Sequence, residues 1–229
     1  MPAFFVTGTD TDIGKTTVSL ALLAAARARG LSTLGLKPVA AGCETTPDGL
    51  RNADALALLA ASSVSPLRYE EVNPVALPLP CSPHLAARDA GRRLTISQLA
   101  GYTRGSLGRR ADLMLVEGAG GWRVPLSERE LMSALPRELS LPVILVCGLR
   151  LGGLNAALLT AEAILRDGLK LAGWVGNCVQ PDMLLPDENL ETLRRWLPAP
   201  CLGMLPWAPR ESDAERGARL DLTTLCPAV

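Results

Sequence analysis

The chain has 229 residues, 48% of them hydrophobic, and its 23 Lys and Arg residues balance 23 Asp and Glu residues. This length and composition suit a folded α/β domain and exclude a disordered chain. Because there is no basic excess, nothing indicates binding to nucleic acid or to an anionic membrane surface. We therefore expect any anion site to be local.

Cysteine usage and the start of the chain indicate a cellular compartment. Six scattered cysteines contain no Cys-x-x-Cys pair, and several lie in apolar runs, so we interpret them as buried thiols in a reducing compartment. No signal peptide opens the chain, and no apolar run reaches about 18 residues, the length of a spanning helix. We therefore expect a cytoplasmic protein without a membrane segment.

Strand-like and helix-like segments alternate along the chain. Apolar runs predict strands at Phe4–Thr7, Thr33–Leu36, Asp112–Glu117, Pro142–Cys147, Leu171–Gly176 and Pro200–Leu205. Helices are predicted at Thr16–Arg29, Ala53–Ala61, Ser97–Arg109, Glu128–Leu139, Leu154–Arg166 and Asp187–Trp196, with Gly30 and Gly168 ending two of them. The alternation predicts one α/β domain over residues 1–229, with a mostly parallel, doubly wound sheet and helices on both faces.

Two segments do not fit the alternation. The proline-rich piece Asn73–Pro83 cannot be a helix and is a poor central strand, so we expect an ordered surface loop. After Pro206 we expect a loop and a short terminal helix around Glu211–Arg219.

The most informative stretch lies near the start of the chain. An apolar run leads into the loop Gly8–Gly14, and Lys15-Thr16 opens an alanine-rich helix. Strand, loop and helix in this order are the context of a phosphate-binding loop of P-loop NTPases. Lys15 is then expected to reach the β- and γ-phosphates, and the Thr16 hydroxyl to bind Mg²⁺. Five residues rather than four separate the two glycines, so a chance match is the alternative.

Polar residues follow the other predicted strands, and ligands of open α/β sheets bind at that edge. Glu117 ends a strand before a glycine-rich turn, the position of an acidic metal ligand. Asp54 is either a third metal ligand or a helix N-terminal carboxylate. Lys37 is either a clamp for a transferring phosphoryl group or a surface lysine. The Gly152-Gly153 turn is either a second anion site or a plain connection.

Taken together, these motifs resemble those of the dethiobiotin synthetase family, and the longer Thr9-Asp10-Thr11 loop is that family's own form. The resemblance extends from residue 3 to about residue 207. The matching segments are Gly8-Thr9-Asp10-Thr11-Asp12-Ile13-Gly14-Lys15-Thr16, Lys37-Pro38-Val39-Ala40, Thr46–Leu56, Val72-Asn73-Pro74, Ser82-Pro83-His84, Val116–Trp122, Leu141–Val146, Leu151-Gly152, Leu171–Asn177 and Leu205-Pro206-Trp207.

The resemblance implies an ATP- and Mg²⁺-dependent cyclo-ligase of biotin biosynthesis. One amine of 7,8-diaminononanoate (diaminopelargonate) would capture CO₂ as a carbamate, which attacks the γ-phosphate of ATP to give a carbamic–phosphoric anhydride. The second amine then closes the ureido ring and releases phosphate. Such phosphoryl transfer needs positioning and charge neutralisation more than covalent chemistry by the protein.

The resemblance also implies site residues and a homodimer with its active site at the interface, where Arg150–Asn155 of one subunit acts in the other. Implied catalytic residues are Lys37, Lys15 and Thr11, and implied Mg²⁺ ligands are Thr16, Asp54 and Glu117. Implied nucleotide-binding residues are Asp12, Ile13, Gly14, Lys15, Thr16, Thr17, Asp54, Glu117, Gly118, Ala119, Gly120, Asn177, Cys178, Pro206, Trp207 and Ala208. Implied substrate-binding residues are Thr11, Lys37, Ala41, Arg150, Leu151 and Asn155.

The chain departs from the family pattern in three places. Ala41 stands where the family usually has Ser or Thr, so one hydroxyl to the substrate is missing, which a water or the nearby Cys43 could replace. The segment Glu128–Ser140 has little likeness, with Ala134 where an acidic residue is frequent, and residues after Trp207 match poorly. A family member with impaired activity is therefore one alternative.

Two other classes of protein share parts of this pattern. An ATPase switch of the partition and septum-placement type (ParA/MinD-like) would carry an extra lysine early in the phosphate loop, where this chain has Thr7-Gly8-Thr9-Asp10. An amidotransferase-type ligase of corrinoid synthesis would need a further glutaminase domain, for which the chain is too short. We expect neither, and no nucleic-acid or membrane partner.

Overall fold

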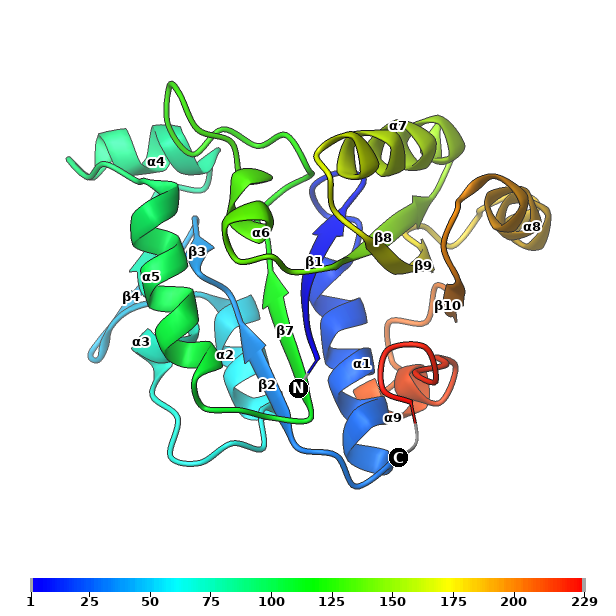
Figure 1. Cartoon of the computed structure of the whole chain (residues 1–229), viewed down its shortest axis with the longest axis horizontal. Coiled ribbons are helices and arrows are strands. Elements are labelled where there is room, and N and C mark those ends of the chain that lie inside the picture. Colours follow the sequence, from blue (N-terminus) through cyan, green and yellow to red (C-terminus); the bar gives the residue numbers. More distant parts are fainter. Residues whose placement is uncertain (1, 228–229) are drawn as a thin grey trace.

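The structure is a computed structural model that describes residues 2–227 (Figure 1). Its centre is a six-stranded sheet in the order β10-β9-β8-β1-β7-β2, in which every described pairing is parallel. These strands match the six predicted apolar runs closely. Their bounds are β1 Ala3–Gly8, β2 Thr33–Leu36, β7 Leu113–Glu117, β8 Val143–Leu149, β9 Leu171–Cys178 and β10 Cys201–Leu205.

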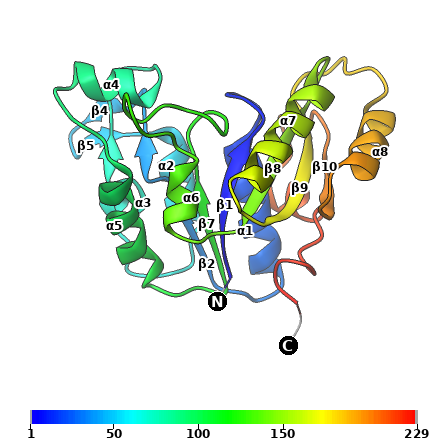
Figure 2. The ribbon, with the colours of Figure 1, turned by 45° about the horizontal axis from the view of Figure 1, so that its top comes forward.

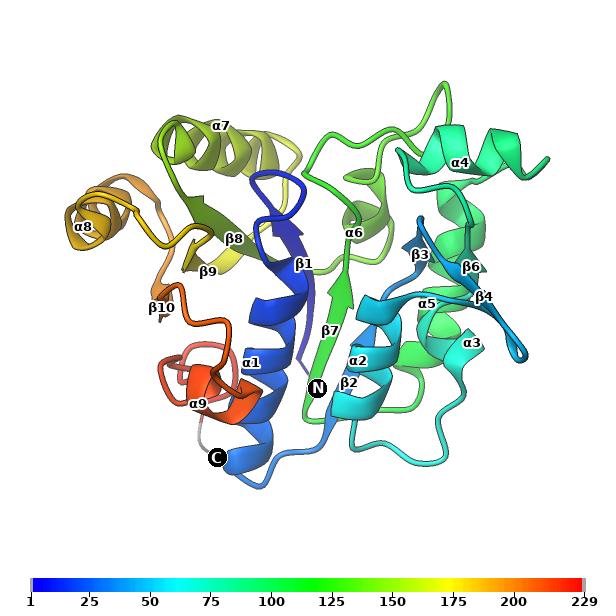
Figure 3. The ribbon, with the colours of Figure 1, turned by 180° about the vertical axis from the view of Figure 1, so that it is seen from behind.

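Helices cover both faces of the sheet, which explains why the inner strands are mostly apolar. Every residue of β7, β8 and β9 is buried. Figures 1 and 3 show α5, α6 and α7 on one face and α1, α2 and α9 on the other, with α8 beside the β10 edge. The bounds are α1 Lys15–Ala28, α2 Ala53–Ala61, α5 Ile96–Leu107, α6 Ala134–Glu138, α7 Gly153–Arg166, α8 Pro186–Trp196 and α9 Asp213–Gly217. The predicted doubly wound α/β fold is confirmed.

Glycines end two of the helices as predicted. Gly30 follows α1 and Gly168 follows α7, with φ angles of 76° and 79°. This left-handed conformation costs a residue with a Cβ atom energy, and glycine adopts it freely.

The proline-rich segment is more ordered than we expected. Residues 77–82 form the expected loop, but β6 (Val75–Ala76) pairs with β3 (Val39–Ala40), and Pro83 begins α4 (Pro83–Asp89). Pro83 fits there because the backbone N–H that proline lacks would have no partner within the helix at this position. The sequence pattern also missed α3 (Tyr69–Val72) and the hairpin of β4 (Glu44–Thr46) with β5 (Gly49–Arg51).

The helix predicted at Glu128–Leu139 is wrong over its first half, because only α6 forms. The amide groups of Leu126 and Ser127 donate to the carbonyl of Glu130, and Pro125 bridges Leu131. The Glu130 carboxylate accepts from the amide of Ile96 at 3.3 Å and so stabilises the N-terminus of α5. These long-range partners outweigh the helical preference of the segment. The terminal helix, predicted around Glu211–Arg219, is shorter and forms α9 (Asp213–Gly217).

All strands of the sheet run in one direction, so their carboxyl ends meet at one edge. β1 lies between β7 and β8, at the point where the connections diverge to the two sides of the sheet. Figure 2 shows the loop after β1 between the α4 and α7 sides of the molecule. No helix in residues 2–227 is long and apolar enough to cross a membrane.

Candidate functional site

The loop between β1 and α1 is held by a side chain from a distant strand. Gly14 precedes α1 with a φ of 83°, and a Cβ atom there would collide with Nδ2 of Asn177. That same Nδ2 donates to the carbonyl of Ile13 at 2.7 Å, and Asn177 is buried near the end of β9. Glycine is therefore required at position 14 both by backbone conformation and by the approach of Asn177.

Lys15 is buried at the mouth of this loop. Its Nζ donates to the carbonyl of Asp10 at 2.9 Å, and the residue is 8% exposed. Burial lowers the pKa of its ammonium group, although Glu117 acts in the opposite direction. An ammonium group that is poorly solvated in this way is available to bind an anionic phosphate placed at the loop.

Two carboxylates and a second buried lysine lie next to the loop. Nζ of Lys37 is 2.6 Å from Oε1 of Glu117 and 3.1 Å from Oδ2 of Asp54. Burial opposes the charged form of Lys37, but the two carboxylates outweigh it and raise its pKa. Lys37 is therefore a buried, paired cation, and the alternative of a surface lysine is wrong.

Glu117 also binds the start of α1. Thr16 donates from Oγ1 to Oε1 of Glu117 at 2.7 Å, and Ser19 donates from Oγ to Oε2 at 2.8 Å. Sequence reasoning missed Ser19. Its spacing of three residues from Thr16 puts both hydroxyls on the same helix face and was the available signal.

The Thr16 hydroxyl and the carboxylates of Asp54 and Glu117 form a donor set that fits Mg²⁺. Magnesium takes oxygen ligands and is usually held by one or two carboxylates together with phosphates and water. Within residues 2–227 no group of three or more His, Cys, Asp or Glu side chains could hold a metal. Asp54 also lies in the first turn of α2, two residues after the N-cap residue Asn52, where a carboxylate stabilises the helix N-terminus.

A cavity of about 790 Å³ adjoins these side chains and brings together most of the predicted site. Predicted residues that line it are Thr11, Asp12, Gly14, Lys15, Thr16, Thr17, Lys37, Ala41, Asp54, Glu117, Ala119 and Gly120. Seven further residues line it: the sequence analysis noted Ala40, Asn52, Ser82 and Pro83 only as parts of matching segments, and it did not single out Pro80, Cys81 or Val124. Ile13 is buried beneath the loop, and Gly118 packs closely on the ring of Phe5.

A smaller cavity of about 250 Å³ lies on the other side of the loop and shares Asp12, Gly14 and Thr17 with the first. It gathers the five remaining predicted nucleotide residues, which are Asn177, Cys178, Pro206, Trp207 and Ala208. The loop therefore stands between a larger cavity lined by Lys15, Lys37, Asp54 and Glu117 and a smaller one whose lining includes the indole of Trp207.

Three predicted substrate residues line neither cavity. Nη2 of Arg150 is 2.6 Å from Oδ2 of Asp10 in the same chain, Leu151 is 95% exposed, and Asn155 is exposed near the start of α7. Cys43, considered as a replacement for the hydroxyl missing at Ala41, is buried and donates to the carbonyl of Ala40. All six cysteines are free thiols; Cys43, Cys147, Cys178 and Cys226 are buried as predicted, whereas Cys81 and Cys201 are only partly buried.

The fold and the loop define the class of protein, a P-loop NTPase-type α/β protein. The MinD cell division protein of Aquifex aeolicus matches with a TM-score of 0.54 at 13% identity, covering 97% of this chain and 89% of that one. Chloroplast FtsY of Physcomitrella patens matches with a TM-score of 0.51 at 18% identity, covering 98% of this chain and 63% of that one. These likenesses show the fold alone.

Sequence comparison then identifies the family. A family model described as an AAA domain matches residues 2–215. The ATP-dependent dethiobiotin synthetase BioD of Cellvibrio japonicus is 58% identical over 226 residues, covering 99% of this chain and 98% of that protein. The protein of the same name from Pseudomonas aeruginosa (strain UCBPP-PA14) is 59% identical over 225 residues, covering 98% of each. The chain belongs to the ATP-dependent dethiobiotin synthetase family.

Proposed function

We propose that this protein is an ATP- and Mg²⁺-dependent dethiobiotin synthetase that carboxylates and cyclises 7,8-diaminononanoate. One observation carries the proposal: two buried lysines, Lys15 and Lys37, and two carboxylates, Asp54 and Glu117, surround one cavity beside the phosphate loop. The family membership supports the same activity. The ATPase-switch alternative has only the shared fold in its favour.

The nucleotide is proposed to lie across the loop. Its phosphates would bind the loop amides and Lys15, and its base would enter the smaller cavity beside Asn177 and Trp207. Thr16, Asp54 and Glu117 would hold Mg²⁺, which neutralises the charge of the phosphate oxygens.

The reaction needs positive charge where the phosphoryl group moves. A carbamate oxygen attacks the γ-phosphorus, the bond to ADP breaks, and the second amine then attacks the carbamoyl carbon and expels phosphate. We propose that Lys15 and Lys37 stabilise the charge on the moving phosphoryl group and on the carbamate, since preorganised ammonium groups in a buried site need little rearrangement. Thr11, at the cavity wall, would orient the carbamate or the diamine.

Substrate recognition is proposed to involve a homodimer. Arg150, Leu151 and Asn155 lie outside the cavities of their own chain, and this agrees with a role at the site of a second subunit. Leu151 is 95% exposed in the single chain, so its side chain is free to contact a second subunit. We also infer a single domain over residues 1–229 and a cytoplasmic location.

Ala41 keeps one alternative open, a family member with impaired activity. Ser82 lines the same cavity as Ala41, and its hydroxyl lies 3.0 Å from Nδ1 of His84. The loss of one neutral hydrogen bond costs about 0.5–1.5 kcal/mol, which at most slows turnover roughly tenfold. The proposed activity is therefore compatible with Ala41.

The deciding experiment is phosphate release from the purified protein with ATP and Mg²⁺, with and without the diamine and bicarbonate. We expect release to depend on both, with dethiobiotin detected by mass spectrometry, and Lys37→Ala to abolish it. Equal ATP hydrolysis without either co-substrate would contradict the proposal in favour of a switch ATPase. Nucleotide binding without turnover would favour impaired activity, and Ala41→Ser would then be the next variant.

The dimer needs its own measurement. Light scattering after size exclusion should give twice the chain mass, and Leu151→Asp should lower the dimer fraction and the affinity for the diamine together. Leu184→Asp is the matched control, since Leu184 is 82% exposed and precedes α8. A monomeric wild-type protein with full diamine-dependent turnover would contradict the interface.

A further inference from the structure

Ser19 lies on α1 one turn after Thr16, and both hydroxyls donate to the carboxylate of Glu117. The distances are 2.7 Å from Thr16 Oγ1 to Oε1 and 2.8 Å from Ser19 Oγ to Oε2. Ser19 is fully buried and Glu117 is 1% exposed. Two side chains of one helix thus hold the two oxygens of a carboxylate that comes from β7, 98 residues further along the chain for Ser19.

The two carboxylate oxygens accept different numbers of hydrogen bonds. An ionised carboxylate offers about four lone-pair sites, two on each oxygen. Oε1 accepts from Thr16 and from Lys37, while Oε2 accepts from Ser19. One site remains, and it belongs to the oxygen that Ser19 binds. The orientation of that oxygen therefore depends directly on Ser19.

Within residues 2–227 the Ser19 side chain has one described hydrogen bond, to Glu117. Apart from Lys15, the other buried residues of α1 are apolar, and Val18, Ala21, Leu22 and Ala26 among them are fully buried. Alanine has the higher helix propensity, and a buried hydroxyl is unfavourable unless it is hydrogen-bonded. The buried hydroxyl of Ser19 is explained by its bond to the Glu117 carboxylate.

We propose that Ser19 is a positioning residue: it fixes the side chain of Glu117 so that the carboxylate presents its free oxygen site to a nucleotide-bound Mg²⁺. This inference rests on the proposed function, because that function makes Glu117 a magnesium ligand. Groups that orient a metal ligand typically change metal affinity about 10- to 100-fold when they are removed. Ser19 itself touches neither metal nor nucleotide in this role.

The test compares nucleotide binding with and without magnesium. Calorimetry with the non-hydrolysable β,γ-imido analogue of ATP gives a Kd in excess Mg²⁺ and another in EDTA. We expect Ser19→Ala to weaken binding about tenfold in Mg²⁺ and to leave the Kd in EDTA unchanged. Ser19→Thr, which keeps the hydroxyl, should restore most of the loss, and Ser19→Cys, with a weak donor of similar size, should restore less.

A matched control separates this role from ordinary packing. Ser106 is also buried on a helix and donates to a single partner, the carbonyl of Glu71, at 2.6 Å. Ser106→Ala should therefore lower thermal stability without changing the magnesium dependence. Glu117→Gln should abolish most of the magnesium effect, and Ser19→Ala in that background should add nothing further, because contacting residues that act as a unit are not additive.

Each outcome is decisive. If Ser19→Ala weakens binding equally in Mg²⁺ and in EDTA, or changes only thermal stability, Ser19 is structural and the inference is overturned. The same holds if the effects of Ser19→Ala and Glu117→Gln add fully. If the wild-type protein binds the nucleotide equally well in Mg²⁺ and in EDTA, Glu117 is not a magnesium ligand and the inference is overturned. The diamine-dependent phosphate release described above tests the proposed function separately.

Discussion

Nζ of Lys37 lies 2.6 Å from Oε1 of Glu117, and the two side chains are 7% and 0% exposed. This pair joins the end of β2 to the end of β7 beneath the cavity. Neither charge reaches bulk water, so each depends on the other and on the few groups around them. The energetics of this cluster distinguish Lys37 from Lys15.

Lys37→Ala should destabilise the protein as well as stop turnover. Removing one partner of a buried ion pair leaves the other charge uncompensated, at a typical cost of about 3–5 kcal/mol. Because Asp54 is 45% exposed and shares the contact, we expect about 3 kcal/mol in urea unfolding. Lys37→Arg keeps the charge and should retain more of the stability. Unchanged stability in Lys37→Ala would contradict the buried pair.

Lys15→Met, unlike Lys37→Ala, should weaken nucleotide binding without lowering stability. The Lys15 ammonium is buried, its Nζ has one described hydrogen bond, to a backbone carbonyl, and burial lowers its pKa. Removing it should leave the melting temperature unchanged or higher. Nucleotide affinity should fall by about 10- to 100-fold, since a charge-assisted hydrogen bond contributes about 1.5–3 kcal/mol. Calorimetry and thermal unfolding measure the two effects, and a large loss of stability would contradict the prediction.

Gly14→Ala should lower the stability of the protein much more than Gly168→Ala does. Gly14 and Gly168 have similar φ angles of 83° and 79°, but only Gly14 has Asn177 where a Cβ atom would be. Gly168→Ala should therefore cost only the left-handed conformation, about 1–2 kcal/mol. Gly14→Ala should cost more and also prevent nucleotide binding, because the loop must open. Equal stability of the two variants would show that Asn177 moves aside freely.

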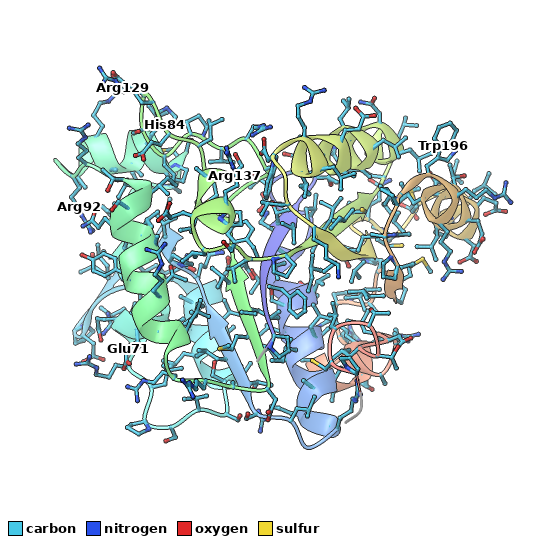
Figure 4. All side chains as sticks on the ribbon, in the orientation of Figure 1. Glu71, His84, Arg92, Arg129, Arg137 and Trp196 are labelled. Atoms are coloured by element: carbon cyan, nitrogen blue, oxygen red, sulfur yellow. The ribbon has the colours of Figure 1, made fainter. Side chains whose placement is uncertain are left out.

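Glu71 should contribute stability that depends on pH. It accepts from Arg109 at 2.6 Å and from Arg68 at 3.0 Å and 3.2 Å, and these bonds lower its pKa from 4.5 to about 2. A carboxylate with a depressed pKa in the folded state stabilises the protein above pH 4.5, and this stability is lost as the pH falls towards 2. Figure 4 shows Glu71 near the end of α5 that is remote from α4.

The variant that tests this is Glu71→Gln, measured by urea unfolding between pH 7 and pH 2.5. We expect a loss of about 1–2 kcal/mol at pH 7 that shrinks steadily below pH 4.5. Glu70→Gln is the control, because Glu70 is next in the chain and 64% exposed in its pair with Arg51. A difference between wild type and Glu71→Gln that stays constant with pH would contradict the depressed pKa.

Local patterns in the sequence determined the sheet, most of the helices and the phosphate loop. The apolar runs gave the six strands because both faces of the sheet are covered, so each strand carries its own signal. Lys15 and Thr16 were recognisable because a phosphate loop is continuous in sequence. Glu117 was found because it ends a buried strand, and parallel strands bring their carboxyl ends to one edge, whereas Asn177 was named through the family resemblance.

Only the tertiary structure decided what depends on contacts between distant segments. Ser19 has its role because α1 packs beside β7, and Asn177 explains Gly14 because β9 passes the loop. Glu130 joins a turn instead of a helix because it stabilises the N-terminus of α5. Such pairings arise from the path of the whole chain, and local propensity carries no information about a partner one hundred residues away.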